Sequence, residues 1–236
     1  NQMADKLEKI ETMRRQLIGD VSHELRTPLT AIKGYLEALM DGVLPANPET
    51  YQQIHSEIDR LQRLVNDLQE LSRVEADVIQ LQVAPVSPAS LIERIQNTLG
   101  RQFEEKNIKL VTDVEPGLPN VLLDQDRIIQ VLTNLVGNAL QYTPKGGKVI
   151  ICVRWEKTNL LFSVKDTGIG ISAEQLNFIF NRFYRTDKSR NRASGGSGIG
   201  LTIAKALVQA HRGTIWAESN GEGKGSTFSF LIPIPK

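Results

Sequence analysis

The sequence contains one cysteine, Cys152, among 236 residues, so no framework of disulfides stabilises it. It also lacks any run of about 18 apolar residues, the length that a membrane-spanning helix requires. No basic segment followed by an apolar one opens the sequence, so we expect no secretory signal and a cytoplasmic location. The formal net charge is +1, which gives no reason to expect nucleic acid or an anionic membrane as a direct partner.

The composition that remains is typical of a globular protein, with 40% hydrophobic and 23% charged residues. At about 100 to 200 residues per domain, this length provides one large or two modest domains. Residues 1–80 carry 9 basic and 14 acidic side chains, a net charge of −5, whereas residues 81–236 carry 19 and 13, a net charge of +6. This asymmetry indicates two domains, of which the second suits an anionic ligand.

The first 80 residues have the pattern of two amphipathic helices. Apolar side chains recur every three or four residues over 7–39 and again over 54–71. Residues 42–48 separate the two helices, with Asn47 as the expected N-cap and Pro48 as the first residue of the second helix. A two-helix hairpin buries its apolar stripe poorly, so we expect a homodimer that forms a four-helix bundle. Packing of the hairpin onto the rest of the chain is the alternative.

Residues 81–88 contain two prolines and indicate a linker, after which helices and strands are mixed. They do not alternate regularly, as they would in a doubly wound parallel sheet, so we expect an α+β fold in which helices and a sheet form a sandwich. We expect helices over 90–106, 126–142 and 198–211, and strands over 108–114, 149–155, 160–164, 214–217 and 226–232.

A first candidate site lies inside the first helix. His23 lies off the apolar stripe, so its imidazole is expected to face solvent, where Glu24 could accept a proton from one ring nitrogen and leave the other nucleophilic. Thr27 stands one turn further along the same face. Pro28 cannot donate to the carbonyl of Glu24, so we expect the helix to bend there. An ordinary surface histidine in a kinked helix is the alternative.

A second candidate site lies on the helix expected over 126–142. Asn134, Asn138 and Tyr142 follow one another at intervals of four residues, on a stripe beside the buried face. Two carboxamides in this arrangement could ligate a hard cation and bind phosphate oxygens, and the tyrosine could pack on a base. Asparagines on a solvated helix face, without function, are the alternative.

Two glycine-rich segments complete the candidates. Asp166-Thr-Gly168-Ile-Gly170 follows an expected strand, where a fixed carboxylate could accept a hydrogen bond from an exocyclic amine, although a simple turn would use the same residues. Gly195-Gly-Ser-Gly-Ile-Gly-Leu201 opens a helix, and the free amides there favour phosphate. Because the sequence has no GxxxxGK[ST] loop, a nucleotide would be bound in another way.

A basic segment lies between these two. It could close over phosphates as a lid, and a solvated loop is the alternative. Residues 181–192 contain Arg182, Arg185, Lys188, Arg190 and Arg192 against Asp187, a net charge of +4.

In this order the segments resemble the five motifs of the sensor histidine kinases of two-component signalling, and the resemblance covers essentially the whole chain. His23-Glu-Leu-Arg-Thr-Pro-Leu29 resembles the H box, Asn134-Leu-Val-Gly-Asn-Ala-Leu-Gln-Tyr142 the N box, and Asp166-Thr-Gly-Ile-Gly170 the G1 box. Phe180-Asn-Arg-Phe-Tyr-Arg185 resembles the F box, and Gly196-Ser-Gly-Ile-Gly-Leu201 the G2 box. Residues 191–198 are also similar to envelope-stress sensors of the BaeS type.

The resemblance implies a protein-histidine kinase that uses ATP and Mg²⁺. His23 would be the phosphoacceptor, Glu24 the base that primes it, and Thr27 the residue that positions a water for removing phosphate from the partner protein. Arg185 would contact the γ-phosphate, ahead of Arg182.

Further roles in the nucleotide site are implied in the same way. Asn138 would bind Mg²⁺, Asn134 would support the phosphates, and Asp166 would accept from the adenine amino group. The other residues implied in nucleotide binding are Tyr142, Gly168, Gly170, Gly196, Ser197, Gly198, Gly200 and Leu201.

The resemblance also implies a domain order and partners. Residues 1–16 would be an N-terminal signalling coiled coil, 17–80 the dimerisation and histidine phosphotransfer domain, 81–88 the linker, and 89–236 a Bergerat-type ATP-binding domain. A cognate response regulator would dock on the hairpin near His23 and receive the phosphoryl group on an aspartate. The chain would be the cytoplasmic portion of a sensor that an N-terminal input region anchors in the membrane.

One position departs from the family pattern, and two other interpretations stay open. Gln141 stands where the family often has Lys or Arg, and a neutral amide cannot neutralise phosphate charge. An ATPase of the gyrase or heat-shock-chaperone kind would share the nucleotide motifs but lack the hairpin that carries His23. A dimeric scaffold would bind nucleotide or regulator without phosphorylating itself.

Overall fold

The structure, a computed structural model, describes residues 2–75, 80–184 and 196–234. They form two compact units. The first unit is the helical hairpin up to Gln69, together with Gly196 and Ser197, and the second contains the described residues from Glu70 onward apart from those two. No helix among the described residues is both long enough and apolar enough to cross a membrane.

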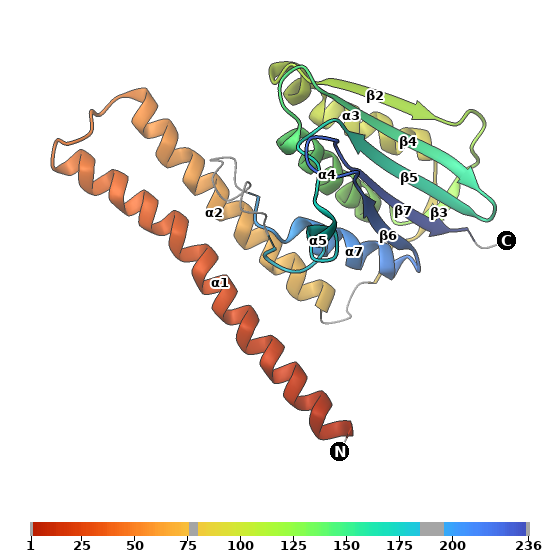
Figure 1. Cartoon of the computed structure of the whole chain (residues 1–236), viewed down its shortest axis with the longest axis horizontal. Helices are drawn as coiled ribbons and strands as arrows, with labels where there is room; N and C mark the ends of the chain where they lie inside the picture. Colours follow the sequence, from red (N-terminus) through yellow and green to blue (C-terminus); the bar gives the residue numbers. More distant parts are fainter. Residues whose placement is uncertain (1, 76–79, 185–195, 235–236) are drawn as a thin grey trace. The chain divides into compact units, whose positions relative to one another are not determined.

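Two long antiparallel helices, α1 (Gln2–Met40) and α2 (Pro48–Glu75), make up the hairpin (Figure 1). After α1 ends, Gly42 takes a φ of +70°, a conformation that glycine adopts without a steric penalty. Asn47 caps α2, because its Oδ1 accepts from the backbone N–H of Thr50 at 2.9 Å and from the Thr50 hydroxyl at 2.8 Å. The predicted break, cap and helix start are therefore confirmed.

The hairpin leaves part of its apolar surface uncovered. Ile54 and Leu64 are buried, whereas Leu29, Ile58 and Val65 keep 52%, 46% and 39% of their surface exposed. Such exposure over one helical hairpin is what the predicted four-helix bundle would cover. The homodimer stays a prediction, as does the bend expected at Pro28, through which α1 continues as one helix.

A five-stranded sheet forms the second unit, in the order β2-β4-β5-β7-β6 (Figure 1). Its β2 pairs parallel to β4, and the remaining pairs are antiparallel. Helices α3, α4 and α7 pack on the sheet, which confirms the predicted α+β sandwich. The bounds are α3 (Pro88–Glu105), β2 (Lys109–Val114), α4 (Gln125–Tyr142), β4 (Lys148–Glu156), β5 (Asn159–Asp166), α7 (Gly200–Ala210), β6 (Thr214–Glu218) and β7 (Thr227–Pro233).

Alternation along the central strands places the core on one face of the sheet. In β4 and β5, every second side chain is buried and its neighbours are half-buried or exposed. Phe162 of β5 stacks on Phe230 of β7 with ring centroids 4.7 Å apart, and both are fully buried. The buried faces of α3, α4 and α7 cover these strands, so the fold holds α4 firmly against the sheet.

Three short elements were not predicted. The strands β1 (Ala84–Val86) and β3 (Val121–Leu123) pair with each other, and α5 (Ala173–Leu176) follows β5. β1 lies within the segment expected to be a linker. It was missed because a strand of three residues is too short to show periodicity and because Pro85 argues against a strand. The other expected elements agree with the structure to within a few residues.

The cap of α2 gives a first prediction. Asn47→Ala removes the acceptor for the Thr50 N–H, so the hairpin should lose about 1 kcal/mol of stability. Urea unfolding followed by circular dichroism, at one fixed protein concentration, measures this loss. Asn47→Asp keeps an acceptor oxygen and is the matched control, which should unfold at the wild-type midpoint. Equal midpoints for the Ala and Asp variants would show that the cap does not stabilise the hairpin.

Candidate functional site

His23 lies on α1 with its side chain exposed, as predicted. Glu24 beside it is half-buried, and Thr27 is exposed one turn further on. The hydroxyl of Thr27 donates to the carbonyl of His23 at 3.3 Å, which leaves the oxygen free to accept from another group. His23 is therefore open to solvent, with a carboxylate next to it in sequence.

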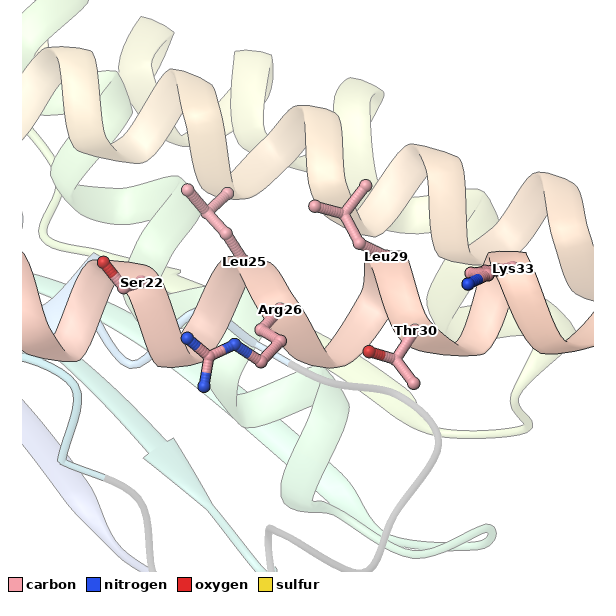
Figure 2. Close-up of a pocket in the computed structure, with 6 residues that line it drawn as sticks. All are labelled: Ser22, Leu25, Arg26, Leu29, Thr30 and Lys33. Carbon is pink, nitrogen blue, oxygen red and sulfur yellow. The ribbon is translucent and has the colours of Figure 1, made fainter.

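An open pocket lies along α1 from Ser22 to Lys33, next to His23 in sequence. Figure 2 shows that Leu25 and Leu29 project to one side of the helix, while Arg26 and Thr30 project to the other. The pocket therefore combines apolar, hydroxyl and cationic groups close to the histidine. Its lining residues are Ser22, Leu25, Arg26, Leu29, Thr30 and Lys33.

In the second unit, α4 carries the asparagine stripe at the predicted positions. Its buried face packs into the core, whereas Asn134, Asn138 and Tyr142 are half-buried beside it. The Nδ2 of Asn134 donates to the carbonyl of Gly200 at 3.0 Å, so Asn134 holds the start of α7. The structure thus brings the asparagine stripe of α4 and the glycine-rich segment at the start of α7 together through this hydrogen bond.

Asp166 ends β5 as a buried carboxylate with 5% of its surface exposed. Its Oδ1 accepts from the backbone N–H groups of Gly168, at 2.7 Å, and Ser226, at 3.3 Å. Its Oδ2 accepts from the Ser226 hydroxyl at 2.5 Å. A carboxylate oxygen accepts about two hydrogen bonds, so Oδ2 keeps capacity for one more donor. This is the arrangement expected of a carboxylate that recognises an amine.

The loop after Asp166 passes close to the C-terminal end of α4. The backbone N–H of Ile169 donates to the carbonyl of Tyr142 at 3.2 Å. A Cβ on Gly168 would lie 2.6 Å from that carbonyl oxygen, so only glycine fits there. Gly170 takes a φ of +69° and a side chain on it would collide with Gly221. The stripe that ends at Tyr142 and the glycine-rich segment that begins at Asp166 therefore meet at this end of α4.

The start of α7 holds the last predicted cluster in part. Gly198 accepts from the backbone N–H of Phe183 at 3.0 Å, Gly200 opens the helix, and Leu201 follows, half-buried. Arg185, with most of the basic segment, lies outside the described residues. Its predicted contact with phosphate stays a prediction.

Gly196 and Ser197 group with the first unit. There the hydroxyl of Ser197 donates to Oδ2 of Asp67 at 2.5 Å. Burial raises the pKa of the Asp67 carboxyl, against the opposing effects of this hydrogen bond and of the Arg63 charge. The nucleotide-binding role of Gly196 and Ser197 stays a prediction.

Two residues that build the site were missed in the sequence. Ser226 supplies two of the three hydrogen bonds to Asp166, and Gly225 before it leaves no room for a side chain beside the Asp166 backbone. The glycine-rich run from Gly221 to Gly225 was the available signal, because close backbone approach is a common reason for such a run.

Lys106 is a third residue that was missed. Its ammonium group donates to the carbonyls of Leu140, at 2.5 Å, and Gln141, at 3.1 Å, where the C-terminal end of the α4 dipole favours a cation. A positive charge therefore lies beside the backbone of Gln141, the position where the sequence departs from the family pattern.

The second unit presents a buried carboxylate beside a glycine-rich loop and a polar stripe on α4, and the first unit presents an exposed histidine. Comparison with protein families agrees with both. Residues 13–77 match the family described as the His Kinase A (phospho-acceptor) domain, and residues 123–236 match the histidine kinase-, DNA gyrase B- and HSP90-like ATPase family. The chain belongs to the sensor histidine kinases, which confirms the resemblance inferred from the motifs.

Relatives with curated names are similar along nearly the whole chain. The sensor histidine kinase WalK of Bacillus subtilis is 42% identical over 234 residues, which are 96% of this chain and 38% of that protein. The signal transduction histidine-protein kinase BaeS of Escherichia coli is 39% identical over 236 residues, which are all of this chain and 50% of that protein. The chain therefore spans half or less of the length of these relatives.

Solved structures share the fold. The histidine kinase AdeS of Acinetobacter baumannii superposes with a TM-score of 0.76 at 27% identity, over 91% of this chain and 98% of that one. ThkA in complex with the response regulator TrrA gives 0.75 at 28% identity, over 93% of this chain and 61% of that one. Full-length ShkA in complex with AMPPNP gives 0.70 at 30% identity, over 94% and 46%.

The close approach of Gly168 to the Tyr142 carbonyl, called the Gly168 cradle below, gives a second prediction. Gly168→Ala forces the loop away from the Tyr142 carbonyl, and should destabilise the second unit by about 1 to 3 kcal/mol. Gly100→Ala on α3 is the control, because nothing lies within 4 Å of its Cβ and alanine favours helix by about 0.5 to 1 kcal/mol. Thermal unfolding should therefore shift in opposite directions. A stable Gly168→Ala variant would contradict the described cradle.

Proposed function

We propose that the chain is the kinase core of a sensor histidine kinase. It transfers the γ-phosphoryl group of Mg·ATP to a ring nitrogen of His23 and then to an aspartate of a response regulator, and it also removes phosphate from that regulator. The observation that carries the proposal is the presence, in one chain, of an exposed His23 on a phosphoacceptor hairpin and of the buried Asp166, whose Oδ2 can accept a further donor.

ATP fits the groups that the second unit presents. The exocyclic amine of adenine is a donor that suits the remaining capacity of Asp166 Oδ2, and the glycine at 168 allows the base to approach the backbone. Tyr142 ends α4 beside this loop and can pack on the base. The match to the ATPase family, and the AMPPNP bound by the similar kinase ShkA, support the assignment.

Magnesium fits the asparagines of the stripe on α4, beside Tyr142. In the described part of the chain no group of three or more His, Cys, Asp or Glu side chains could hold a metal. Mg²⁺ is commonly bound by one or two protein oxygens together with substrate phosphates. We assign this role to Asn138, one turn from Asn134, which supports the phosphates from its position against Gly200.

Residues around His23 serve the transfer. Phosphoryl transfer breaks the bond between the γ-phosphorus and the bridging oxygen, which leaves with ADP, and forms a phosphorus–nitrogen bond. Glu24 accepts the proton that the imidazole loses, and Thr27 positions the water that later removes phosphate from the regulator. Arg185 neutralises charge on the γ-phosphate. Positioning supplies most of the catalysis, since such reactions require little covalent chemistry from the protein.

A regulator and a second copy of the chain are the proposed partners. The pocket along α1 presents leucines together with the exposed cations Arg26 and Lys33, which suit an acidic protein surface beside His23. ThkA, which is similar over 93% of this chain, forms a complex with a response regulator. The exposed apolar stripe of the hairpin supports dimerisation through a four-helix bundle.

The proposed domains follow the same division. Residues 17–80 form the dimerisation and phosphotransfer domain, 81–88 the linker, and 89–236 the ATP-binding domain. Residues 1–16 extend α1 as a signalling coiled coil toward an input region, which anchors the full-length sensor in the membrane. The similarity to WalK, a sensor histidine kinase, and to BaeS, a signal transduction histidine-protein kinase, supports this arrangement, because both are longer than this chain.

The phosphoacceptor gives a third prediction, and the chain offers a matched control. His23→Gln should abolish label on the protein after incubation with γ-labelled ATP and Mg²⁺, whereas His55→Gln should keep it, since His55 is also exposed but pairs with Asp59 on α2. The label on the wild type should be acid-labile and base-stable. Equal labelling of the His23 variant would defeat the assignment. Release of free phosphate without labelled protein would indicate an ATPase, and neither product would indicate a nucleotide-sensing scaffold.

Ser226 gives a fourth prediction. Ser226→Ala removes the hydroxyl that donates to Asp166 Oδ2, so the carboxylate should be less firmly oriented toward adenine. We expect the Kd for a fluorescent ATP analogue to rise about fivefold, which corresponds to about 1 kcal/mol. Ser163→Ala, on the same strand as Asp166, is the control and should bind as the wild type does. An unchanged Kd for the Ser226 variant would show that this hydroxyl does not orient the carboxylate.

A further inference from the structure

His211 is a buried histidine far along the chain from both proposed reaction groups. It follows α7 directly and keeps only 8% of its surface exposed. Its Nδ1 lies 2.8 Å from the carbonyl oxygen of Leu207, and its Nε2 lies 3.1 Å from the backbone nitrogen of Asp124. A carbonyl can only accept and an amide N–H can only donate, so the ring is neutral with its proton on Nδ1. Both ring nitrogens are therefore fully used.

Asp124 connects this histidine to two further segments. It is the N-cap of α4, because its Oδ1 accepts from the backbone N–H of Arg127 at 3.2 Å. Its Oδ2 accepts from the backbone N–H of Gln82 at 2.8 Å, in the segment that precedes β1. Asp124 is itself 6% exposed. One buried residue thus joins the start of α4, the end of α7 and the proposed linker.

A second connection joins the same two helices further along, where Asn134, in the middle of α4, donates to the carbonyl of Gly200 at the start of α7. Asp124 and Asn134 are ten residues apart, about 15 Å along a helix, and Gly200 and His211 are eleven residues apart, about 16 Å. The residue before α4 is joined to the residue after α7, and the middle of α4 to the start of α7, so the two helices run antiparallel. Between these two connections, both helices bury their apolar faces in the core.

We propose that His211 and Asp124 are positioning residues that set the register of α7 on α4, and that the Gln82 segment is coupled through them to nucleotide affinity. The inference rests on the proposed nucleotide site. While the hydrogen bond between Asp124 and His211 is in place, the carbonyl of Gly200 stays opposite Asn134. Asn134 lies one turn from Asn138, the proposed Mg²⁺ ligand. Without the bond to His211, the register of α7 on α4 depends on apolar packing and on the single hydrogen bond between Asn134 and Gly200. Because coupling between two sites is reciprocal, nucleotide must in turn tighten the bond between Gln82 and Asp124.

Two substitutions of His211 distinguish the contributions of its two ring nitrogens. The amide of glutamine reaches the position of Nε2 and can still accept from Asp124, whereas the amide of asparagine reaches only the position of Nδ1. We therefore expect His211→Gln to keep the wild-type Kd for a fluorescent ATP analogue with Mg²⁺, and His211→Asn to raise it five- to tenfold. Equal affinity of the two variants would overturn the proposal.

A purely structural role is tested by a core variant. Phe162→Leu weakens the stacked pair with Phe230, away from the α4–α7 connections, and should lower the melting temperature as much as His211→Asn does. If the proposal holds, Phe162→Leu leaves nucleotide affinity within twofold of the wild type. If both variants lose affinity in proportion to their melting temperatures, His211 only stabilises the fold and the proposal fails.

Hydrogen exchange tests the coupling to the linker. Saturating nucleotide should slow exchange at the Gln82 amide at least threefold in the wild type and leave it unchanged in His211→Asn. Nucleotide that binds the wild type without slowing this amide would overturn the coupling. Wild-type protein that binds no nucleotide at all would instead refute the proposed function, so the two failures are distinguishable.

Discussion

The burial of one carboxylate organises the second unit. Taking the charge of Asp166 out of water is costly unless hydrogen bonds replace those of the solvent, and the structure supplies them from Gly168 and Ser226. Meeting this requirement brings the loop after β5 and the start of β7 so close together that side chains at positions 168 and 225 would collide with neighbouring backbone. The glycines at these positions allow the backbone to approach the carboxylate, and the space beside them is where we propose that adenine binds.

α4 connects the Gly168 cradle to the rest of the proposed nucleotide site. Its C-terminal end receives the loop at Tyr142 and the ammonium group of Lys106, its middle carries the asparagines, and its N-terminal end is held by Asp124. The proposed phosphoacceptor has the opposite environment, since His23 is exposed on a helix with a partly uncovered apolar stripe. A proposed nucleotide site built on a packed helix and a buried carboxylate, together with an accessible histidine, would suit a kinase whose phosphoryl group is passed to another protein.

Local sequence patterns predicted those features whose positions depend on residues nearby in the sequence. The Asn47 cap, the alternation in β4 and β5, and the half-buried stripe of Asn134, Asn138 and Tyr142 each depend on spacing within a few residues. Ser226 and His211 were missed because their partners lie 60 and 87 residues away, and a single serine or histidine has no local signature. β1 and β3 were missed because three-residue strands are defined by their pairing.

The central claim concerns one covalent bond on His23. Phosphorus-31 NMR of the chain after incubation with Mg·ATP, followed by gel filtration to remove nucleotide, observes that bond directly. The account predicts a phosphoramidate resonance on the protein, which mass spectrometry under basic conditions assigns to the peptide that contains His23 and which disappears when the cognate regulator is added. A phosphorylated residue elsewhere, or consumption of ATP with no phosphorus bound to the protein, would contradict it.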